Sequence, residues 1–578
     1  MFKKKLLLMT FALTLFGAKI FASGIQVINT TVSTNDDRQT ATVKFSLTWD
    51  HSWRLEGPPS TSNPGNWDAA WVFIKYRTLP GDNWHHAYIS TIAADHTMPG
   101  NAQFRVGQSI ANVHGANIQV GVGTFIYRAQ TGSGTVMFQD CELKWNFTQN
   151  GLTGGEQVEV CVLATEMVYI PLGGFWLGDY TSQGRFRNNT SQTTNSTAHI
   201  AEMAYNVTGA AIPAAFSNAH MHTNQTTAGY INPINTTRTY LASWGWSGQT
   251  PGPPNPDDAG AYHRQNVYNG TNAVGDGFST NYPRGYNAFY CMKYEITQGE
   301  YLQFLNKNVV SVKNASTYWY DGGETPTGRY YIIKRENTGT QNVPAEYDFI
   351  NPAAAYLPMP YLSTNDIMAW LIWAGLRPMT ELEFEKICRG PVAIHTTPTL
   401  RPQYAWGTVD IYPAAGFTNQ GGANEAPSNT TGNAAVATAG GTAIGSGTNS
   451  ALVGPMRAGG FATPVSSREK AGATFYGVME MSGNLWERAV SAGSAAGRAF
   501  QGWGVAGHGN GETGAGPNPV LPAGGGWPSA TGQGLGFRGG SYLDHQDRAR
   551  ISDRMFINHN PGTARHPSFG GRGVRSEL

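Results

Sequence analysis

The stretch that decides the fold of this 578-residue chain is residues 359–390, MPYLSTNDIMAWLIWAGLRPMTELEFEKICRG. It predicts two helices, at residues 363–375 and 380–389, separated by a short link. Ser363 and Thr380 suit the N-cap position, because their side-chain oxygens can accept hydrogen bonds from the free N–H groups of the first helical turn. An acid three residues after Thr380 completes a capping-box pattern. Around this stretch the sequence favours short strands and long polar loops, so we expect few helices.

The composition agrees with a helix-poor fold. Only 13% of the residues are charged, about half of the usual 25% or so for soluble domains, which disfavours coiled coils and long charged surface helices. Glycine is abundant, with 72 residues, as expected for a chain with many loops. The 39 basic and 38 acidic residues leave no net positive field that would attract phosphates, so no nucleic-acid partner is expected.

The N-terminus has the anatomy of a secretory signal peptide. Lysines at residues 3–5 precede an apolar run over residues 6–16, and small residues follow. We expect residues 1–23 to be removed, which changes the formal net charge from +1 to −3 because four lysines and no acid are lost. An uncleaved anchor is the alternative, but the apolar run is short for a helix that must span a bilayer. The prediction is a secreted or cell-surface protein without a membrane span.

Two domains are predicted to follow. Residues 24–165 contain runs such as ATVKFSLTW, AAWVFIKYR and NIQVGVGTFIYRA, in which apolar and polar residues alternate. This period of two, with Gly, Pro, Asn and Asp between the runs, predicts an antiparallel β-sandwich. Residues 166–578 then change to short strands, long loops and a few helices, one of them expected at residues 297–306. Nothing in the first domain distinguishes self-association from docking as its role.

The four cysteines are Cys141, Cys161, Cys291 and Cys388. An even number in an exported chain permits two disulfides, and sequence alone leaves three connectivities open. Proximity along the chain favours Cys141–Cys161, which leaves Cys291–Cys388. The alternative is four buried thiols. None of the cysteines lies in a CxxC motif or beside a histidine, so neither a zinc site nor a redox pair is expected.

Several segments of the second domain resemble, in the same order, the formylglycine-generating enzyme family, also called the sulfatase-modifying factor domain. Besides the stretch at 359–390, they are MVYIPLGGFWLGD at 167–179, YCMKYEITQGEYLQFLN at 290–306, YAWG at 404–407, YGVMEMSGNLWER at 476–488, FRGGSY at 537–542 and FGGRGVR at 569–575. The resemblance implies an α+β domain with a variant of the C-type lectin fold for residues 166–578. It also implies a bacterial, exported protein.

The catalytic cysteines of the family are missing. Oxidase members bind copper through two cysteines that follow the Gly-Gly-Ser strand, because Cu(I) requires soft thiolate ligands. Here Asp544 stands where the first of these cysteines would fall, and Gly573 stands where the family usually has a C-terminal cysteine. We therefore expect no copper, no catalytic residue and, in this sense, a pseudoenzyme. An iron site would need a cluster of His and carboxylates, for which Asp544, His545 and Asp547 supply the atom types.

The resemblance also implies a structural calcium around the Gly-Asn-Leu-Trp-Glu segment, since calcium takes hard oxygen ligands. The implied ligands are the carboxylates of Glu480 and Glu487 with the backbone carbonyls of Gly483 and Leu485. The alternative is that Glu487 only pairs with an arginine, such as Arg538 or Arg554.

Arginines are frequent near the end of the chain: Arg548, Arg550, Arg554, Arg565, Arg572 and Arg575. We expect several of them to pair with buried carboxylates and backbone carbonyls, because the guanidinium group is well suited to bridging loops. The alternative is a basic face formed by Arg548 and Arg550 for an anionic partner.

The retained fold segments and the missing cysteines together predict a non-catalytic binding or structural protein at the cell surface or in the medium, with an unknown protein or glycan as partner. A second hypothesis is a diversified ligand-binding protein of the type that retroelements target, because residues 542–567 lie between the Gly-Gly-Ser strand and the closing segment. A third is an enzyme of the family with altered metal chemistry. The candidate ligand-binding residues are Asp544, His545, Asp547, Arg554 and His559.

Overall fold

The computed structural model describes residues 24–60, 62–177, 205–206, 220–221, 231–232, 282–315, 318–319, 333–337, 339–340, 343–391, 403–420, 422–437, 454–463, 465–491, 495–502, 509–512, 534–553, 556–557 and 562–577. Strands dominate, and the helices are few and short. The predicted signal peptide lies outside these residues. No helix in the described ranges has both the length and the apolar character needed to cross a membrane.

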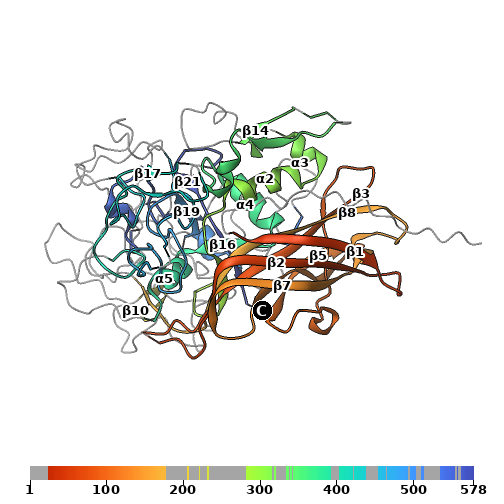
Figure 1. Ribbon diagram of the computed structural model, residues 1–578, viewed down its shortest axis with the longest axis horizontal. Helices are drawn as coiled ribbons and strands as arrows, with labels where there is room; N and C mark the ends of the chain where they lie inside the picture. Colours follow the sequence, from red (N-terminus) through yellow and green to blue (C-terminus); the bar gives the residue numbers. More distant parts are fainter. Residues whose placement is uncertain are drawn as a thin grey trace, which may run out of the picture.

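Long strands make up most of the N-terminal part: β1 (Gln26–Thr34), β2 (Ala41–Arg54), β3 (Asp68–Thr78), β4 (His85–His86), β5 (Ala102–Val113), β6 (Ala116–Arg128), β7 (Gly132–Trp145) and β8 (Val158–Ile170). Strands β1, β2 and β7 form a three-stranded sheet. Its apolar face, which includes Phe45 and Phe138, packs against Val72 of β3, Ile126 of β6 and Val162 of β8. The two layers are visible in Figure 1. Alternation of apolar and polar residues gives β2 one buried face, as the sequence predicts. Strand β3 is instead buried on both faces, because Val72 packs in the core between the two sheets and Trp71 packs in the core on the other side of the strand.

The second sheet joins the N-terminal and C-terminal parts of the chain. It has eleven strands, and its main path runs β20-β19-β16-β22-β13-β8-β3-β6-β5. The C-terminal strands of this sheet are β13 (Phe289–Met292), β16 (Arg377–Thr380), β19 (Trp486–Val490), β20 (Leu535–Arg538), β21 (Phe569–Gly570) and β22 (Gly573–Ser576). The domain boundary predicted between residues 165 and 166 falls inside β8, which pairs with β3 on one side and with β13 on the other. The two predicted domains therefore share one sheet.

The helices are α2 (Gln298–Asn306), α3 (Val310–Asn314), α4 (Thr364–Trp373), α5 (Glu381–Arg389) and α6 (Ala495–Arg498). The helices predicted at 297–306, 363–375 and 380–389 are confirmed. Thr297, Ser363 and Thr380 each cap a helix and belong to capping boxes, completed by Glu300, Asp366 and Glu383. Helix α4 ends before the predicted limit because Gly375 adopts a left-handed conformation, with φ of +70°, which ends the helical backbone.

Short elements complete the described fold: the 3-10 helices η1 (Ala93–Asp95), η2 (Phe147–Asn150), η6 (Pro352–Tyr356) and η7 (Gln546–Ala549), and the strands β9 (Trp176–Leu177), β10 (Tyr205–Asn206), β11 (His220–Met221), β12 (Ile231–Asn232), β14 (Ile333–Arg335), β15 (Tyr347–Phe349), β17 (Phe417–Thr418) and β18 (Ala426–Pro427).

Helices α2, α3 and α4 lie on one side of the large sheet (Figure 1). The core between them contains aromatic residues from both layers, including Trp71 of β3, Phe304 of α2 and Trp370 of α4. Polar contacts also cross this interface. The indole Nε1 of Trp71 donates to the carbonyl of Ala374 at 2.7 Å, and the Nζ of the buried Lys75 donates to the carbonyl of Trp373 at 2.8 Å. The N-terminal strands and the C-terminal helices thus form one continuous core.

Neither predicted disulfide is present, because all four cysteines are free thiols. Cys141 of β7 belongs to the core between the two sheets. Cys161 packs against the core on the opposite side of β8, whereas its neighbours Val160 and Val162 face the same core as Cys141. Side chains alternate along a strand, so the layer of β8 separates the two thiols. Cys291 and Cys388 lie unpaired in a third apolar cluster, where burial raises the pKa of both thiols.

Candidate functional site

The segment predicted to hold calcium, residues 480–487, forms a tight loop that leads into β19. Glu480, Gly483 and Asn484 all have positive φ angles, of 57°, 98° and 68°. A Cβ atom on Gly483 would lie 2.6 Å from the carbonyl oxygen of Ala435, which explains why a glycine is required at this position. The backbone N–H of Asn484 donates to the same carbonyl at 2.8 Å. The loop is thereby fixed to a segment about 50 residues earlier in the chain.

Glu487 is paired with an arginine inside the protein. The Nε of Arg572 donates to one carboxylate oxygen of Glu487 at 2.8 Å, and its Nη2 donates to the other at 2.6 Å. Both side chains are fully buried. Arg572 also donates to the backbone carbonyls of Met292, Lys293 and Met479. The predicted alternative of an arginine partner is therefore what the structure contains, but Arg538 is not that partner, because it bonds to Glu385.

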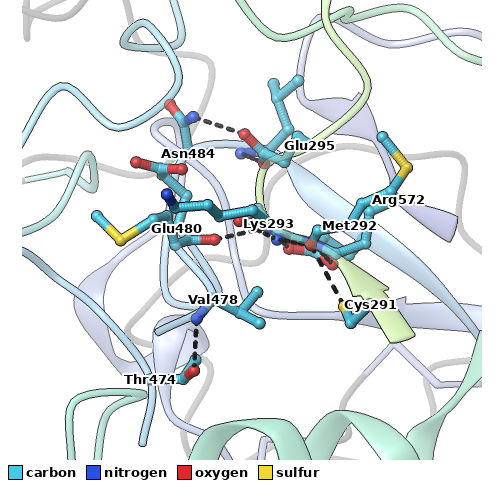
Figure 2. A network of polar contacts seen from close by, with 12 residues as sticks. Cys291, Met292, Lys293, Glu295, Thr474, Val478, Glu480, Asn484 and Arg572 are labelled. Carbon is cyan, nitrogen blue, oxygen red and sulfur yellow. Dashed lines mark hydrogen bonds and ion pairs between the residues drawn. The ribbon is translucent and has the colours of Figure 1, made fainter. Parts of the chain in front are cut away.

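Glu295, which the sequence analysis did not single out, anchors the same loop from the other side. Its carboxylate accepts from the side-chain amide of Asn484 at 2.6 Å and from the backbone N–H of Leu485 at 2.8 Å. Figure 2 shows Glu295, Asn484, Glu480 and Arg572 in this network. Burial, with the negative charge of Glu487 nearby, raises the pKa of Glu295 well above its usual value. The available sequence signal was an acid between two apolar residues, Tyr294 and Ile296, directly before a helix cap.

Glu480 is buried next to this network, with one of its two carboxylate oxygens in use. Its Oε1 accepts from the backbone N–H of Gly459 at 2.9 Å, whereas Oε2 has no hydrogen-bond partner among the described residues. Burial raises the pKa of Glu480 to about 7. A carboxyl group with an unsatisfied buried oxygen is more stable in its neutral form, so Glu480 titrates close to neutral pH.

A second buried charge cluster lies on the adjoining strands. The Nζ of Lys293 donates to Glu166 of β8 at 2.5 Å, and Asp68 at the start of β3 accepts from Trp49 Nε1 and Ser52 Oγ, each at 2.8 Å. Burial raises the pKa of Glu166 to about 8, against the opposing effect of Lys293. The cluster links the strands of the N-terminal part to the segment that follows β13. Lys293 pairs with Glu166, and Asp68 accepts from Trp49 and Ser52, whereas Glu166 Oε2 has no hydrogen-bond partner among the described residues. The ion pair joins two strands of the core, which gives this cluster a structural role.

The predicted calcium ligands do not fit a calcium ion held jointly by Glu480 and Glu487. Both oxygens of Glu487 accept from the guanidinium of Arg572, which supplies the positive charge that a metal ion would bring. Calcium needs six to eight oxygen ligands, and the described residues contain no group of three or more His, Cys, Asp or Glu side chains placed to bind a metal. The guanidinium of Arg572 neutralises the charge of Glu487 in place of a metal ion.

Asp544, which the resemblance puts at the position of the family's first copper-binding cysteine, is a buried carboxyl group. Asp544 is 3% exposed and accepts a hydrogen bond from the Ser541 hydroxyl. Burial raises the pKa of Asp544 to about 7. Gly573 belongs to β22, and the nearby Cys291 and Cys388 are core thiols. These residues offer no pair of thiolates and so do not fit a copper site of the family's oxidase type.

The predicted ligand-binding residues divide into three groups. Asp544 points into the core, while His545 and Asp547 are partly exposed at the start of η7. The His545 Nδ1 lies 3.2 Å from a carboxylate oxygen of Asp547, and Arg550 pairs with the other oxygen at 2.5 Å. Arg554 and His559 lie outside the described residues. The structure therefore brings His545 and Asp547 together with Arg550, and separates Asp544 from them by burial.

The prediction for the C-terminal arginines is confirmed at three of them. Arg572 bonds to Glu487, Arg548 pairs with Asp553 at 3.1 Å, and Arg565 pairs with Asp366 at 2.5 Å. All three carboxylates are buried. Arg572 and Arg565 hold together segments that are far apart in the chain, which a fold with few helices requires, whereas Arg548 and Asp553 are five residues apart.

Comparison with protein families places these observations in context. A family model described as sulfatase-modifying factor enzyme 1-like domain matches residues 259–577. The chain belongs to this family. The sulfatase-modifying factor domain thus includes the capped helices α4 and α5, the loop at 480–487 and the closing strand β22. The match to the family model begins after β8, although β8 and β3 belong to the same eleven-stranded sheet as the strands of the matched domain. No curated protein matches the chain.

Proposed function

We propose that the protein is a secreted or cell-surface, non-catalytic binding or structural protein that uses the sulfatase-modifying factor domain as a rigid scaffold. The observation that supports this proposal most is Asp544. It stands where the resemblance puts the first copper-binding cysteine, and it is buried against Ser541. A carboxyl group in this place cannot supply the soft thiolate that copper-dependent oxygen activation requires. The retained buried ion pairs support a role in which the fold itself is the useful property.

The test is an oxidation assay with the mature chain, copper and a cysteine-containing peptide of the sulfatase type, with mass spectrometry of the peptide as readout. We expect no aldehyde product. A family oxidase that has both cysteines serves as the positive control. Conversion of the peptide by the wild-type chain would contradict the proposal. Loss of that conversion in an Asp544→Ala variant would then identify the chain as an enzyme with altered chemistry at this position.

A diversified ligand-binding protein is the second candidate function. It is favoured by the partly exposed group of His545, Asp547 and Arg550, which opens the stretch 542–567. Sequencing of the flanking DNA tests this candidate. A near-repeat of the stretch together with a reverse transcriptase gene would support it, and their absence would remove it.

The proposal includes export and a division of the fold. We propose that residues 1–23 are cleaved, that the strands up to β8 act as a β-sandwich, and that the rest is a variant of the C-type lectin fold. The packing of β2 and β7 over β3 and β6 supports the sandwich. An unidentified protein or glycan is the proposed partner. Secretion from the native host followed by N-terminal sequencing checks the cleavage, and a mature chain that starts at Met1 would contradict it.

A further inference from the structure

Arg488 on β19 is buried and has no anionic partner among the described residues. Its relative exposure is 1%, and its Nη2 donates to the backbone carbonyl of Leu362 at 3.0 Å. Its Nε and Nη1 have no hydrogen-bond partner among the described residues. The guanidinium lies over the rings of Phe537 and Phe569, with distances to the ring centroids of 4.6 and 5.5 Å. Arg488 therefore keeps several N–H donors unused in an apolar environment.

Three other buried arginines of the domain have an acid as partner. Arg377, Arg538 and Arg572 each donate to a glutamate. The contacts of Arg488 with the two aromatic rings offset part of the desolvation penalty of its charge. Cation–π attraction is weaker than the full penalty for an unpaired buried ion. Burial lowers the pKa of Arg488 to about 9, so the group is still charged at neutral pH. A buried cation with free donors indicates a missing acceptor.

The surroundings of Arg488 carry an excess of positive charge. The carboxylate whose negative charge acts on Arg488 is Asp366, and it is already bound by Arg565 at 2.8 Å and by the backbone N–H of Ser363 at 2.6 Å. Two guanidinium groups thus face one carboxylate. Leu362, the acceptor of Arg488, directly precedes the N-cap of α4, so the positive end of the ten-residue helix dipole lies at the same place. The local field favours one additional negative charge.

The first turn of α4 offers a further unused polar group. The Oγ1 of Thr364 is buried and has no hydrogen-bond partner among the described residues. The segment at residues 562–567 runs past this turn, and the backbone N–H of Thr364 donates to the Gly562 carbonyl at 3.2 Å. Arg565 and His566 of this segment are partly exposed. The first turn of α4 therefore lies beneath this partly exposed segment, so a ligand that binds there must be small.

We propose that Arg488, together with Thr364 and the N-terminus of α4, binds the carboxylate group of a small organic ligand. Guanidinium N–H groups match the geometry of carboxylates, and a monocarboxylate carries a single negative charge at neutral pH. One such charge balances the single excess positive charge of the site, whereas sulfate or doubly charged phosphate would leave an unpaired negative charge in its place. Phe537 and Phe569 add apolar surface for the rest of the ligand. This site rests on the proposed binding role and gives that role a ligand class.

The experiment uses the full mature chain with sodium acetate and sodium benzoate as probes, and sodium chloride and sodium sulfate at matched ionic strength as references. Thermal unfolding and isothermal titration calorimetry give the stabilisation and the affinity. We expect acetate and benzoate to raise the unfolding midpoint above that in chloride, with benzoate the tighter ligand. Arg488→Gln is expected to weaken benzoate binding by about tenfold or more, since it removes a charged hydrogen-bond donor. Arg38→Gln, which removes an exposed arginine between β1 and β2, is expected to bind like wild type.

Thr364→Val provides a second variant that removes a single hydroxyl group with little change in shape. We expect it to weaken benzoate binding by about 2- to 10-fold, the usual effect of one neutral hydrogen bond. Equal benzoate affinity in wild type and Arg488→Gln, or in wild type and Thr364→Val if the arginine variant does not fold, would overturn the proposal. Tighter binding of sulfate than of benzoate would overturn the carboxylate assignment. The peptide oxidation assay is independent of these results, so failure of the scaffold proposal can be told apart from failure of this site.

Discussion

Replacing Arg572 by methionine should strongly destabilise the protein. The change removes both hydrogen bonds to Glu487, at 2.8 and 2.6 Å, and the donors to the carbonyls of Met292, Lys293 and Met479. Both members of the ion pair are fully buried. Loss of one partner leaves an uncompensated charge in the core, which costs about 3–5 kcal/mol. The three carbonyls lose a charged donor as well, so we expect a loss of at least about 3 kcal/mol.

The assay is equilibrium unfolding of the mature chain in urea, followed by tryptophan fluorescence. Arg550→Met is the matched control, because Arg550 pairs with Asp547 at 2.5 Å but both side chains are partly exposed. Such a pair contributes only about 0–1 kcal/mol. In the double variant Glu487→Leu/Arg572→Met no charge is left unpaired, and we expect it to be more stable than Arg572→Met alone.

Two results would refute this reasoning. If Arg572→Met destabilised the chain no more than Arg550→Met, the buried pair would not be a main anchor of the 480–487 loop. If a calcium chelator lowered the unfolding midpoint of the wild-type chain, a metal ion would neutralise part of this acid cluster. We expect the midpoint to be unchanged by the chelator, because the guanidinium already occupies both oxygens of Glu487.

Three further predictions concern a titration, a backbone position and the thiols. The pKa of Glu480 is raised from 4.5 to about 7 by burial. Its neutral form therefore stabilises the fold at low pH, and this stabilisation is lost as the pH rises through 7. In urea unfolding between about pH 5 and pH 8, Glu480→Gln should lose about 3 kcal/mol less unfolding free energy than wild type. The half-exposed Glu469→Gln is the control, and equal pH profiles for Glu480→Gln and wild type would contradict the assignment. Gly483→Ala should lower the free energy of unfolding by about 1–3 kcal/mol, because the added methyl group would clash with the Ala435 carbonyl. Gly134 also has a positive φ angle but has nothing within 4 Å of an added Cβ, so Gly134→Ala should be less destabilising. Equal destabilisation by the two substitutions would contradict the steric argument. Alkylation in denaturant without reductant should label four cysteines, as counted by mass spectrometry, and a lower count would indicate a disulfide.

The helices could be predicted because their signals are local. Thr380 and Glu383 are three residues apart, and the side chain of each accepts a hydrogen bond from the backbone N–H of the other at the start of α5. The pattern can therefore be recognised within a few residues of sequence. The alternation along β2 is local in the same sense and correctly predicted a strand with one buried face, whereas β3 is buried on both faces because distant segments cover its second face. The order of the family segments gave the domain type without any knowledge of contacts.

The partners inside the site could not be predicted, because they are distant along the chain. Glu487 and Arg572 are 85 residues apart, and Glu295 and Asn484 are 189 apart. Several arginines had suitable positions, and nothing in the sequence distinguished Arg572 from Arg538 as the partner of Glu487. The disulfide prediction was wrong for a related reason. Proximity along the chain suggested Cys141–Cys161, but β8 separates the two thiols.

The sequence by itself determined the strand-rich character, the three longer helices and the sulfatase-modifying factor family. Only the tertiary structure decided that β8 joins both parts in one sheet, that Arg572 neutralises Glu487, and that Arg488 is buried with no acid partner in the part of the chain that the structure describes. The physical reason is the distance along the chain between the residues that interact. Capping and alternation depend on neighbouring residues, whereas the partner of a buried charge depends on which distant segments the core brings into contact.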